Sequence, residues 1–476
     1  MESLVVKVYM LIFVFCLYCF LVLVRALSMD MFFDGTIYAS IAQNMALGKG
    51  SFWHLYYTEQ FLNPFYEHPP LAMWLQSIAF RIFGSSWRVE FIWGAICGLI
   101  TLVFIKKTYE EFDTPAGAKN VSWWPILLFI SIPTVTWTFA NNLLENTMIV
   151  FTTGAVYYAI KALKENIQLR IYGYSAISGF LIFAGLMTKG LPALFPLAVP
   201  FIWMIFNLKE EGQAKKSSLM CFARMLLYMF FAAAIVNVFS GGELLKFFGT
   251  YMNEQVMKSV SGQREGIKHF YLFNRFVGEI IVPIFIAGVI YLAIKIKKIH
   301  VEKLAGNNRT ALMFLFIALS ASLPMFFIPK QRIWYLFPSF VFYAMAVAKY
   351  SEHLIAKIKT PAILKYVSIV LFLAGLTTLI FFGGLNFKRN NDLYKDVISQ
   401  KELIPSRAVI YACPTELAKE WEVNAFIQRF CLASLTDDQK RSTGLTLIDK
   451  TKKEGCNIPK DRILINKNPA RYELYK

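Results

Sequence analysis

The sequence has few charged residues for its length and lacks the motifs that mark nucleotide-using enzymes. Charged residues make up 17% of the 476 residues, whereas 57% are hydrophobic. Neither a GxGxxG loop nor a P-loop occurs, so nucleotide hydrolysis and the use of cytoplasmic nucleotide-sugars have no support. We also find no internal repeat and no low-complexity tract. With a mean hydropathy of +0.48, the composition indicates a polytopic membrane protein.

Cysteine is also scarce, with seven residues in the chain. Four of these fall inside apolar segments, where a thiol usually packs as a small hydrophobic group. The other three, Cys413, Cys431 and Cys456, lie in the C-terminal segment, where one pair could oxidise if that segment lies outside the cytoplasm. No Cys or His spacing resembles a zinc cluster.

Long apolar runs dominate the chain instead. A helix of about 17–22 apolar residues crosses a bilayer, and by this criterion we predict roughly 11 to 13 transmembrane helices. The clearest runs are Leu4–Val24, Val89–Ile105, Ser122–Phe139, Thr147–Leu163, Tyr172–Met187, Leu191–Phe206, Leu219–Phe239, Ile280–Ile296, Thr310–Ile328, Leu336–Ala348 and Leu364–Gly384. The predicted fold class is therefore an all-α polytopic membrane protein.

The net charge of +18 follows the predicted topology and does not indicate a nucleic-acid partner. If the N-terminus is inside, Lys and Arg are concentrated in the short cytoplasmic loops, as the positive-inside rule requires. The long segments Arg25–Arg88 and Ser240–Glu279 then lie outside, as does the chain after Leu385. A cleavable signal peptide ending near Ser28 is an alternative, but the long apolar run favours a retained anchor.

The composition changes at the segment "LNFKRNNDLYKD", and the chain after it predicts a small folded domain. The segments "RAVIYACP" and "GLTLID" are typical of short strands, and "TELAKEWEVNAFIQRF" is typical of an amphipathic helix. We therefore predict a transmembrane domain over residues 1–384 and an exterior α/β domain over residues 385–476.

Two acidic motifs fall in the first exterior loop, where charged groups at a membrane rim are often functional. Asp34 begins "DGTIYASIAQNMALG", whose apolar spacing predicts a helix along the surface, and an ordinary N-cap role for Asp34 is the alternative. Glu67 and His68 precede two prolines in "FLNPFYEHPPLAMW". The prolines forbid a helix there and hold a rigid turn.

Further polar groups are predicted on the same outer side. Glu145 lies in "NNLLENTM", and its alternative is a solvated acid in a turn. Lys189 lies in "LMTKGLP", and "FFIPKQRIWYLFP" carries Lys330, Arg332 and Tyr335. Snorkelling at span ends would explain the cations, but a guanidinium beside a phenol also suits a phosphate. Acids facing cations at one rim fit a lipid-linked phosphosugar as substrate.

These motifs, in this order and on these loops, resemble the GT-C glycosyltransferases, and most closely the bacterial lipid A aminoarabinose transferases and the protein O-mannosyltransferases. The resemblance covers roughly residues 1–384, and its motifs are "DGTIYASIAQNMALG", "YEHPPLAMWL", "LLEN", "TKGLPALFPLAVP" and "PKQRIWYLFP". It implies a GT-C fold with amphipathic exterior-loop helices.

The resemblance also implies a role for each matched residue. The catalytic carboxylates would be Asp34 and Glu145, and Tyr38 and Glu67 would line the acceptor side of the cavity. A divalent metal ion, if present, would bind Glu67 and His269. The donor phosphate would be bound by Lys189 with Gly190 in its turn, His68, Lys330, Arg332 and Tyr335.

Three departures from the family pattern put the donor sugar and the metal in question. His68 stands where lysine is usual, Gly35 where many relatives have glutamate, and Glu145 where aspartate is commoner. The first of these side chains titrates near neutral pH and so carries less charge than a lysine.

The predicted function is transfer of a sugar from a polyprenyl-phosphate donor to a lipid, glycan or protein acceptor, by inverting single displacement. The predicted location is the bacterial inner membrane, with the site and the C-terminal domain facing the periplasm and surrounded by membrane lipids. A transporter or flippase of a lipid-linked saccharide is the alternative. Transporters, however, usually place polar groups at mid-membrane within repeats, and we see neither feature.

Overall fold

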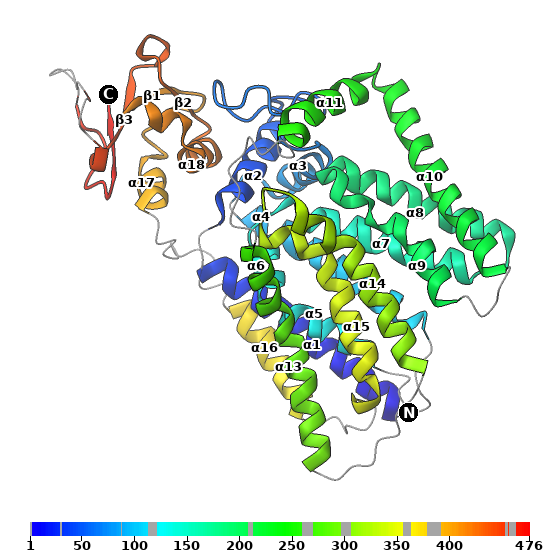
Figure 1. Cartoon of the computed structure of the whole chain (residues 1–476). Helices are drawn as coiled ribbons and strands as arrows, with labels where there is room; N and C mark the ends of the chain where they lie inside the picture. Colours follow the sequence, from blue (N-terminus) through cyan, green and yellow to red (C-terminus); the bar gives the residue numbers. More distant parts are fainter. Residues whose placement is uncertain are drawn as a thin grey trace. The chain divides into compact units, whose positions relative to one another are not determined.

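A computed structural model describes residues 2–28, 31–86, 88–112, 121–207, 213–258, 270–296, 306–355, 363–377, 392–452, 456 and 463–476. Helices dominate the described chain, and its strands lie near the C-terminus (Figure 1). The chain divides into two units. The first comprises Met1–Val24, Gly94–Ala140 and Leu144–Leu379, and the second comprises Arg25–Trp93, Asn141–Leu143 and Ile380–Lys476.

The first unit is helical throughout its described part. Helices α1 and α4 extend a few residues into the second unit. The elements are α1 (Glu2–Ser28), α4 (Arg88–Glu110), α5 (Trp123–Ser131), α6 (Pro133–Ala140), α7 (Leu144–Lys164), α8 (Gln168–Lys189), η1 (Leu191–Ala198), α9 (Val199–Phe206), α10 (Gln213–Phe239), α11 (Glu243–Tyr251), η2 (Met252–Met257), α13 (Phe270–Ile296), α14 (Gly306–Phe327), η3 (Ile333–Leu336), α15 (Phe337–Ile355) and α16 (Ile363–Thr377).

Within the described residues, six helices are long and apolar enough to cross a membrane: α1, α4, α8, α10, α13 and α14. Helices α5 and α6 make a seventh span if they are taken together, although they are bent by 78° at their junction. The other predicted runs form helices that are shorter or more polar within the described residues, and the run Leu364–Gly384 lies partly outside those residues. Large apolar side chains such as Phe239, Phe285 and Ile296 are exposed, as lipid-facing surfaces require. The protein is an integral membrane protein.

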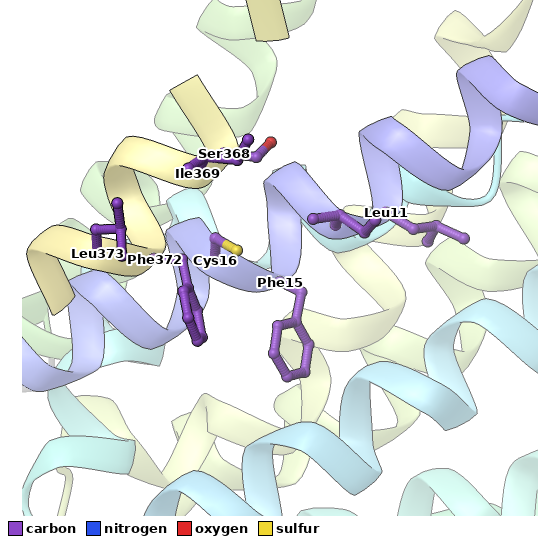
Figure 2. Close-up of a pocket in the computed structure, with 8 residues that line it drawn as sticks. Leu11, Phe15, Cys16, Ser368, Ile369, Phe372 and Leu373 are labelled. Carbon is purple, nitrogen blue, oxygen red and sulfur yellow. The ribbon is translucent and has the colours of Figure 1, made fainter. Parts of the chain in front are cut away.

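An apolar cavity of about 560 Å³ lies between α1 and α16 in the first unit. Figure 2 shows Phe15 and Cys16 from α1 and Phe372 and Leu373 from α16 at its wall. Its lining is almost entirely hydrocarbon, so it offers nothing to a phosphate or a sugar.

The C-terminal part of the second unit forms the predicted α/β structure. It contains α17 (Asp392–Gln400), β1 (Val409–Cys413), η5 (Thr415–Lys419), α18 (Trp421–Cys431), β2 (Ser434–Thr436), η6 (Gln439–Arg441), β3 (Leu445–Asp449), η7 (Lys450–Lys452) and β4 (Tyr472–Tyr475). The strand order is β2-β1-β3-β4. Strand β1 pairs in parallel with β2 and β3, and β4 is antiparallel to β3.

The predicted segments of this domain are present with adjusted limits. The strands expected in "RAVIYACP" and "GLTLID" are β1 and β3, and the expected helix is split into η5 and α18. Cys413 and Cys456 form a disulfide. Cys431 is a buried free thiol, and burial raises its pKa to about 12.

The first exterior loop forms two helices in the second unit, α2 (Phe33–Ala46) and α3 (Leu71–Phe83). The prediction that α2 lies along a surface is wrong, because every residue from Gly35 to Met45 is buried. Helices α3 and α18 both pack against α2, so its polar face is covered as well as its apolar one.

Candidate active site

Asp34 lies in the first turn of α2 and is not its N-cap, which is Phe32. The start of this helix is held by the segment Asn141–Leu143. The backbone N–H of Phe32 donates to Asn141 Oδ1 over 2.7 Å, and Asn142 Nδ2 donates to the carbonyl of Gly35 over 2.9 Å. Two asparagine side chains from another part of the second unit thus hold the first turn of α2.

The glycine after Asp34 is required by this contact. A Cβ atom on Gly35 would lie 1.9 Å from the carbonyl oxygen of Asn141, far inside van der Waals contact. The glutamate that resembling proteins carry at this position therefore has no room in this chain. The close approach of the Asn141 backbone thus explains why glycine stands at position 35, where the family pattern has glutamate.

A buried amide pair supports the same region from α3. Gln76 Nε2 donates to Asn142 Oδ1 over 2.6 Å, and both side chains are buried. Asn142 adopts φ +52°, a conformation that asparagine tolerates better than most residues. Sequence reasoning missed Gln76, Asn141 and Asn142. The asparagine pair directly before "LLEN" was the available signal.

Two phenols and an imidazole lie near the start of α2. Tyr38 is one helical turn after Asp34, so the two share a face, and its ring meets the His68 ring edge-on with centroids 5.6 Å apart. Tyr57 is fully buried. Burial raises the pKa of the Tyr57 phenol well above its ordinary value, and the negative charge of Asp34 raises it further.

The structure thus brings Tyr38 and His68 together, as the site prediction requires. Glu67 is half-buried in the turn directly before His68. Tyr57 was not predicted from the sequence, because nothing in its local pattern marks it as different from the other aromatic residues of the loop.

In the first unit, Glu145 and Lys189 form a buried ion pair. The Glu145 carboxylate accepts a hydrogen bond from Lys189 Nζ, with Glu145 0% and Lys189 8% exposed. The interpretations of Glu145 as a solvated turn acid and of Lys189 as a snorkelling cation are therefore wrong. Glu145 lies in the first turn of α7 and Lys189 in the last turn of α8, the ends at which the helix dipole favours these charges.

The turn after Lys189 fixes the direction of its backbone. Gly190 adopts φ +77°, and a Cβ there would lie 2.5 Å from the Tyr251 hydroxyl oxygen. The Tyr251 hydroxyl is 3.5 Å from the carbonyl oxygen of Lys189. A glycine is thus needed at this position for conformation and for space, which accounts for the Lys-Gly pair in the sequence.

The Lys189 ammonium also lies 5.1 Å from the centre of the Tyr335 ring, a cation–π distance. Tyr335 belongs to η3. One predicted catalytic acid, Glu145, and two predicted phosphate-binding residues, Lys189 and Tyr335, therefore lie in one cluster. The guanidinium carbon of Arg332 instead lies 6.0 Å from the centre of the Trp334 ring, and Lys330 is half-buried in the preceding turn.

This cluster has unused hydrogen-bonding capacity. An ammonium has three N–H donors, and the described residues supply Lys189 with one carboxylate oxygen and one ring face. Glu145 Oε2 is buried and has no hydrogen-bond partner among the described residues. Buried groups of this kind are expected to be satisfied by a ligand or by water.

The predicted metal site cannot be built from the described residues. His269 lies outside them, and no group of three or more His, Cys, Asp or Glu side chains within them is placed to hold a metal ion. The divalent metal at Glu67 and His269 therefore stays a prediction, and no step below uses it.

Comparisons with known proteins agree with this architecture. Residues 67–237 match the sequence model of the family described as dolichyl-phosphate-mannose-protein mannosyltransferase, a range that includes Glu67, Glu145 and Lys189. A comparison with curated protein sequences gave no match.

Solved structures extend the likeness to the whole chain. The crystal structure of ArnT from Cupriavidus metallidurans bound to undecaprenyl phosphate aligns with a TM-score of 0.65 at 13% identity, covering 97% of both chains. The apo form of the same protein aligns with a TM-score of 0.63 at 13% identity, covering 95% of both chains. The chain has the GT-C fold.

Taken with the family match, this fold identifies the class of the protein as a membrane glycosyltransferase. The transporter that the sequence left as an alternative has no support from either comparison.

Proposed function

We propose that the protein transfers a sugar from a polyprenyl-phosphate donor to a hydroxyl or amine of a lipid, glycan or protein acceptor at the outer side of the membrane. The buried Glu145–Lys189 pair beside Tyr335 is the observation that carries this proposal. A buried cation with N–H donors that no described residue accepts suits a phosphate that enters from the bilayer on a hydrocarbon tail.

The phosphate of the donor is the leaving group. As the bond between the anomeric carbon and the phosphate oxygen breaks, negative charge grows on the phosphate. Lys189 stabilises this charge through the N–H donors that no described residue accepts, and the guanidinium of Arg332 and the phenol of Tyr335 add further stabilisation. Polyprenyl phosphate leaves as an anion, so no general acid is needed.

The acceptor is activated by Asp34. Its hydroxyl or amine attacks the anomeric carbon on the face opposite the phosphate, and Asp34 takes the proton that is released. One bond to the anomeric carbon forms as the other breaks, so its configuration is inverted. Asn141 and Asn142 hold the backbone on either side of Asp34, and a base on a fixed helix is suited to an aligned attack.

The outer location is supported by two features of the chain. Short loops expected on the cytoplasmic side are rich in Lys and Arg, and the C-terminal disulfide Cys413–Cys456 is typical of an oxidising compartment. We place the site at the periplasmic face of a bacterial inner membrane. Single-cysteine variants beside Asp34 and Arg332 should both react with a membrane-impermeant thiol reagent added from outside.

The decisive test replaces Asp34 by asparagine, which keeps the shape and removes the base. With purified protein in liposomes and a panel of undecaprenyl-phosphate-linked sugars, Asp34→Asn should lower transfer by about 100- to 10,000-fold. Asp437→Asn, a change at an acid that is partly exposed, is the matched control and should leave transfer unchanged.

Mass spectrometry of envelope glycolipids and glycoproteins, in cells with and without the protein, identifies sugar and acceptor together. Near-normal transfer by a folded Asp34→Asn protein would remove the mechanism, and reactivity of the two labelled positions from opposite sides would remove the proposed location.

A further inference from the structure

The C-terminal α/β domain contains no catalytic motif, yet one of its helices packs on the helix that carries Asp34. Helix α18 packs along α2 within the second unit. Three α2 residues meet it: Ser40 Oγ lies 3.4 Å from the carbonyl oxygen of Ala425, Asn44 Oδ1 accepts from Gln428 Nε2 over 3.2 Å, and Gln43 accepts from Arg429. These α2 positions follow helical spacing, so they form one continuous face.

Arg429 is the centre of this contact. Its Nε donates to Glu90 over 2.6 Å, one terminal nitrogen donates to Gln43 Oε1 over 3.1 Å and to the Ser85 carbonyl over 3.2 Å, and the other donates to the Ser86 carbonyl over 3.0 Å. Both Arg429 and Glu90 are 2% exposed. A single guanidinium thus ties α18 to α2, to the turn before α4 and to the first turn of α4.

A second chain of hydrogen bonds continues from α18 to the loop beside Asp34. Asn44, which accepts from Gln428, donates through Nδ2 to the carbonyls of Tyr56 and Tyr57 over 3.2 and 3.0 Å. Ser434, the first residue of β2, accepts from the backbone N–H of Glu59 over 2.9 Å. The backbone that carries the Tyr57 phenol is therefore fastened from the same side.

We propose that α18 acts as a brace that positions α2, and hence the base Asp34, with Arg429 as its anchoring residue. This inference rests on the proposed function and gives the C-terminal domain a part in the same reaction. Arg429 is a positioning residue: it acts through the placement of α2 and does not contact substrate.

The chemistry of the contact makes Arg429 difficult to replace. Lysine keeps the charge opposite Glu90, but one ammonium cannot reach Gln43 and the Ser85 and Ser86 carbonyls with the planar fork of a guanidinium. Arg429→Lys should therefore fold with Glu90 still neutralised while α2 is held less firmly. Gln428→Leu removes the Asn44 link with little change in volume, and it serves as an independent second variant.

The test uses the full-length protein and two measurements. Hydrogen–deuterium exchange reports the protection of residues 33–46, and steady-state transfer from the undecaprenyl-phosphate sugar that wild-type protein accepts reports kcat and KM. Arg429→Lys should speed exchange in α2 and lower kcat about 10- to 100-fold, since misplacement of a catalytic group has effects of this size. KM for the donor should stay within about twofold, because the phosphate-binding residues are untouched.

Arg471→Gln is the matched control. Arg471 lies in the same domain and pairs with a carboxylate, Asp449, and its described contacts do not include α2. It should leave α2 exchange and kcat unchanged. Unchanged α2 exchange in both Arg429→Lys and Gln428→Leu, an equal effect of Arg471→Gln, or a change confined to KM would overturn the brace. An inactive wild-type protein or an active Asp34→Asn variant would overturn the proposed function instead, and α2 exchange alone would then decide the brace.

Discussion

Glu145–Lys189 in the first unit and Glu90–Arg429 in the second are both buried pairs of opposite charge, but their cations are used differently. Every nitrogen of the Arg429 guanidinium donates a hydrogen bond to a described residue, and the rings of Phe80 and Phe430 lie 5.0 and 5.4 Å away. Lys189 has one carboxylate and one aromatic face among the described residues.

The difference separates a structural ion pair from a binding one. A buried cation whose nitrogens all donate to protein groups gains little from an incoming anion, whereas one with N–H groups that no described residue accepts can bind it. Burial alone does not distinguish the two pairs, and neither does the charge type. The two pairs differ in how many N–H groups of the cation donate to described residues.

The largest expected effect on stability comes from Arg429→Met. It leaves Glu90 buried without its partner, and breaking such a pair lowers the free energy of unfolding by about 3–5 kcal/mol. Denaturant titration of the purified protein measures this loss. Adding Glu90→Gln should recover part of it, and an Arg429→Met protein as stable as wild type would show that the pair is not structural.

The double variant Glu145→Gln/Lys189→Gln should have the opposite profile. Neutral amides replace both charges, so neither is left buried alone and stability should change little. Transfer should fall by about 100- to 1000-fold, the loss seen when a donor to a developing anion is removed. Binding of undecaprenyl phosphate should weaken in parallel. Retained transfer would mean that this pair, too, is only structural.

A smaller effect is expected from Gly190→Ala, which tests how closely the turn holds Lys189. Gly190 has φ +77° and ψ −145°, a region essentially restricted to glycine that costs another residue about 1–3 kcal/mol, and the new Cβ would also meet the Tyr251 hydroxyl. Thermal unfolding measures the loss. Tyr251→Ala in the same chain should relieve the clash but not the strain, and complete recovery would exclude the backbone explanation.

The smallest effect concerns the pair Asp449–Arg471, in which the Arg471 side chain is 35% exposed whereas Asp449 is buried. Burial raises the pKa of Asp449, but hydrogen bonds from Arg471 and Thr451 outweigh it and hold the pKa below its ordinary value. The stability that this pair provides is therefore present above the unfolded-state pKa, near 4, and is lost as pH falls through the lower folded value.

Hydrogen exchange of β3 and β4 between pH 6 and pH 3 measures this loss. Arg471→Gln should flatten the dependence, and an unchanged profile would show that Asp449 is not stabilised by this pair.

Much of the architecture follows from local pattern. Apolar runs predict the long helices, and alternating residues predict β1 and β3, because these features depend on neighbours in sequence. The burial of α2 could not be predicted in this way. Its cover is α18, and the contacts that join them, such as the one between Arg429 and Gln43, link residues 386 positions apart.

The site was partly predictable for the same reason. Glu145, Lys189 and Tyr335 were expected from their motifs, and the structure places them in contact. The proximity of Arg332 to the Trp334 ring and the hydrogen bond from Asn142 to Gly35 were not expected, since side-chain direction depends on packing that a single sequence does not reveal. His269 and the metal stay predictions.

The ion pair between Glu90 and Arg429 has a consequence for biosynthesis. The two residues are 339 positions apart, so at about 5–20 residues per second a ribosome adds the arginine roughly 20–70 s after the glutamate. During that interval the Glu90 carboxylate lacks the Arg429 guanidinium as its partner. A chain that ends before residue 429 never forms this ion pair. Truncated products are thereby left less stable than finished ones, which exposes them to membrane proteases that remove unfolded chains.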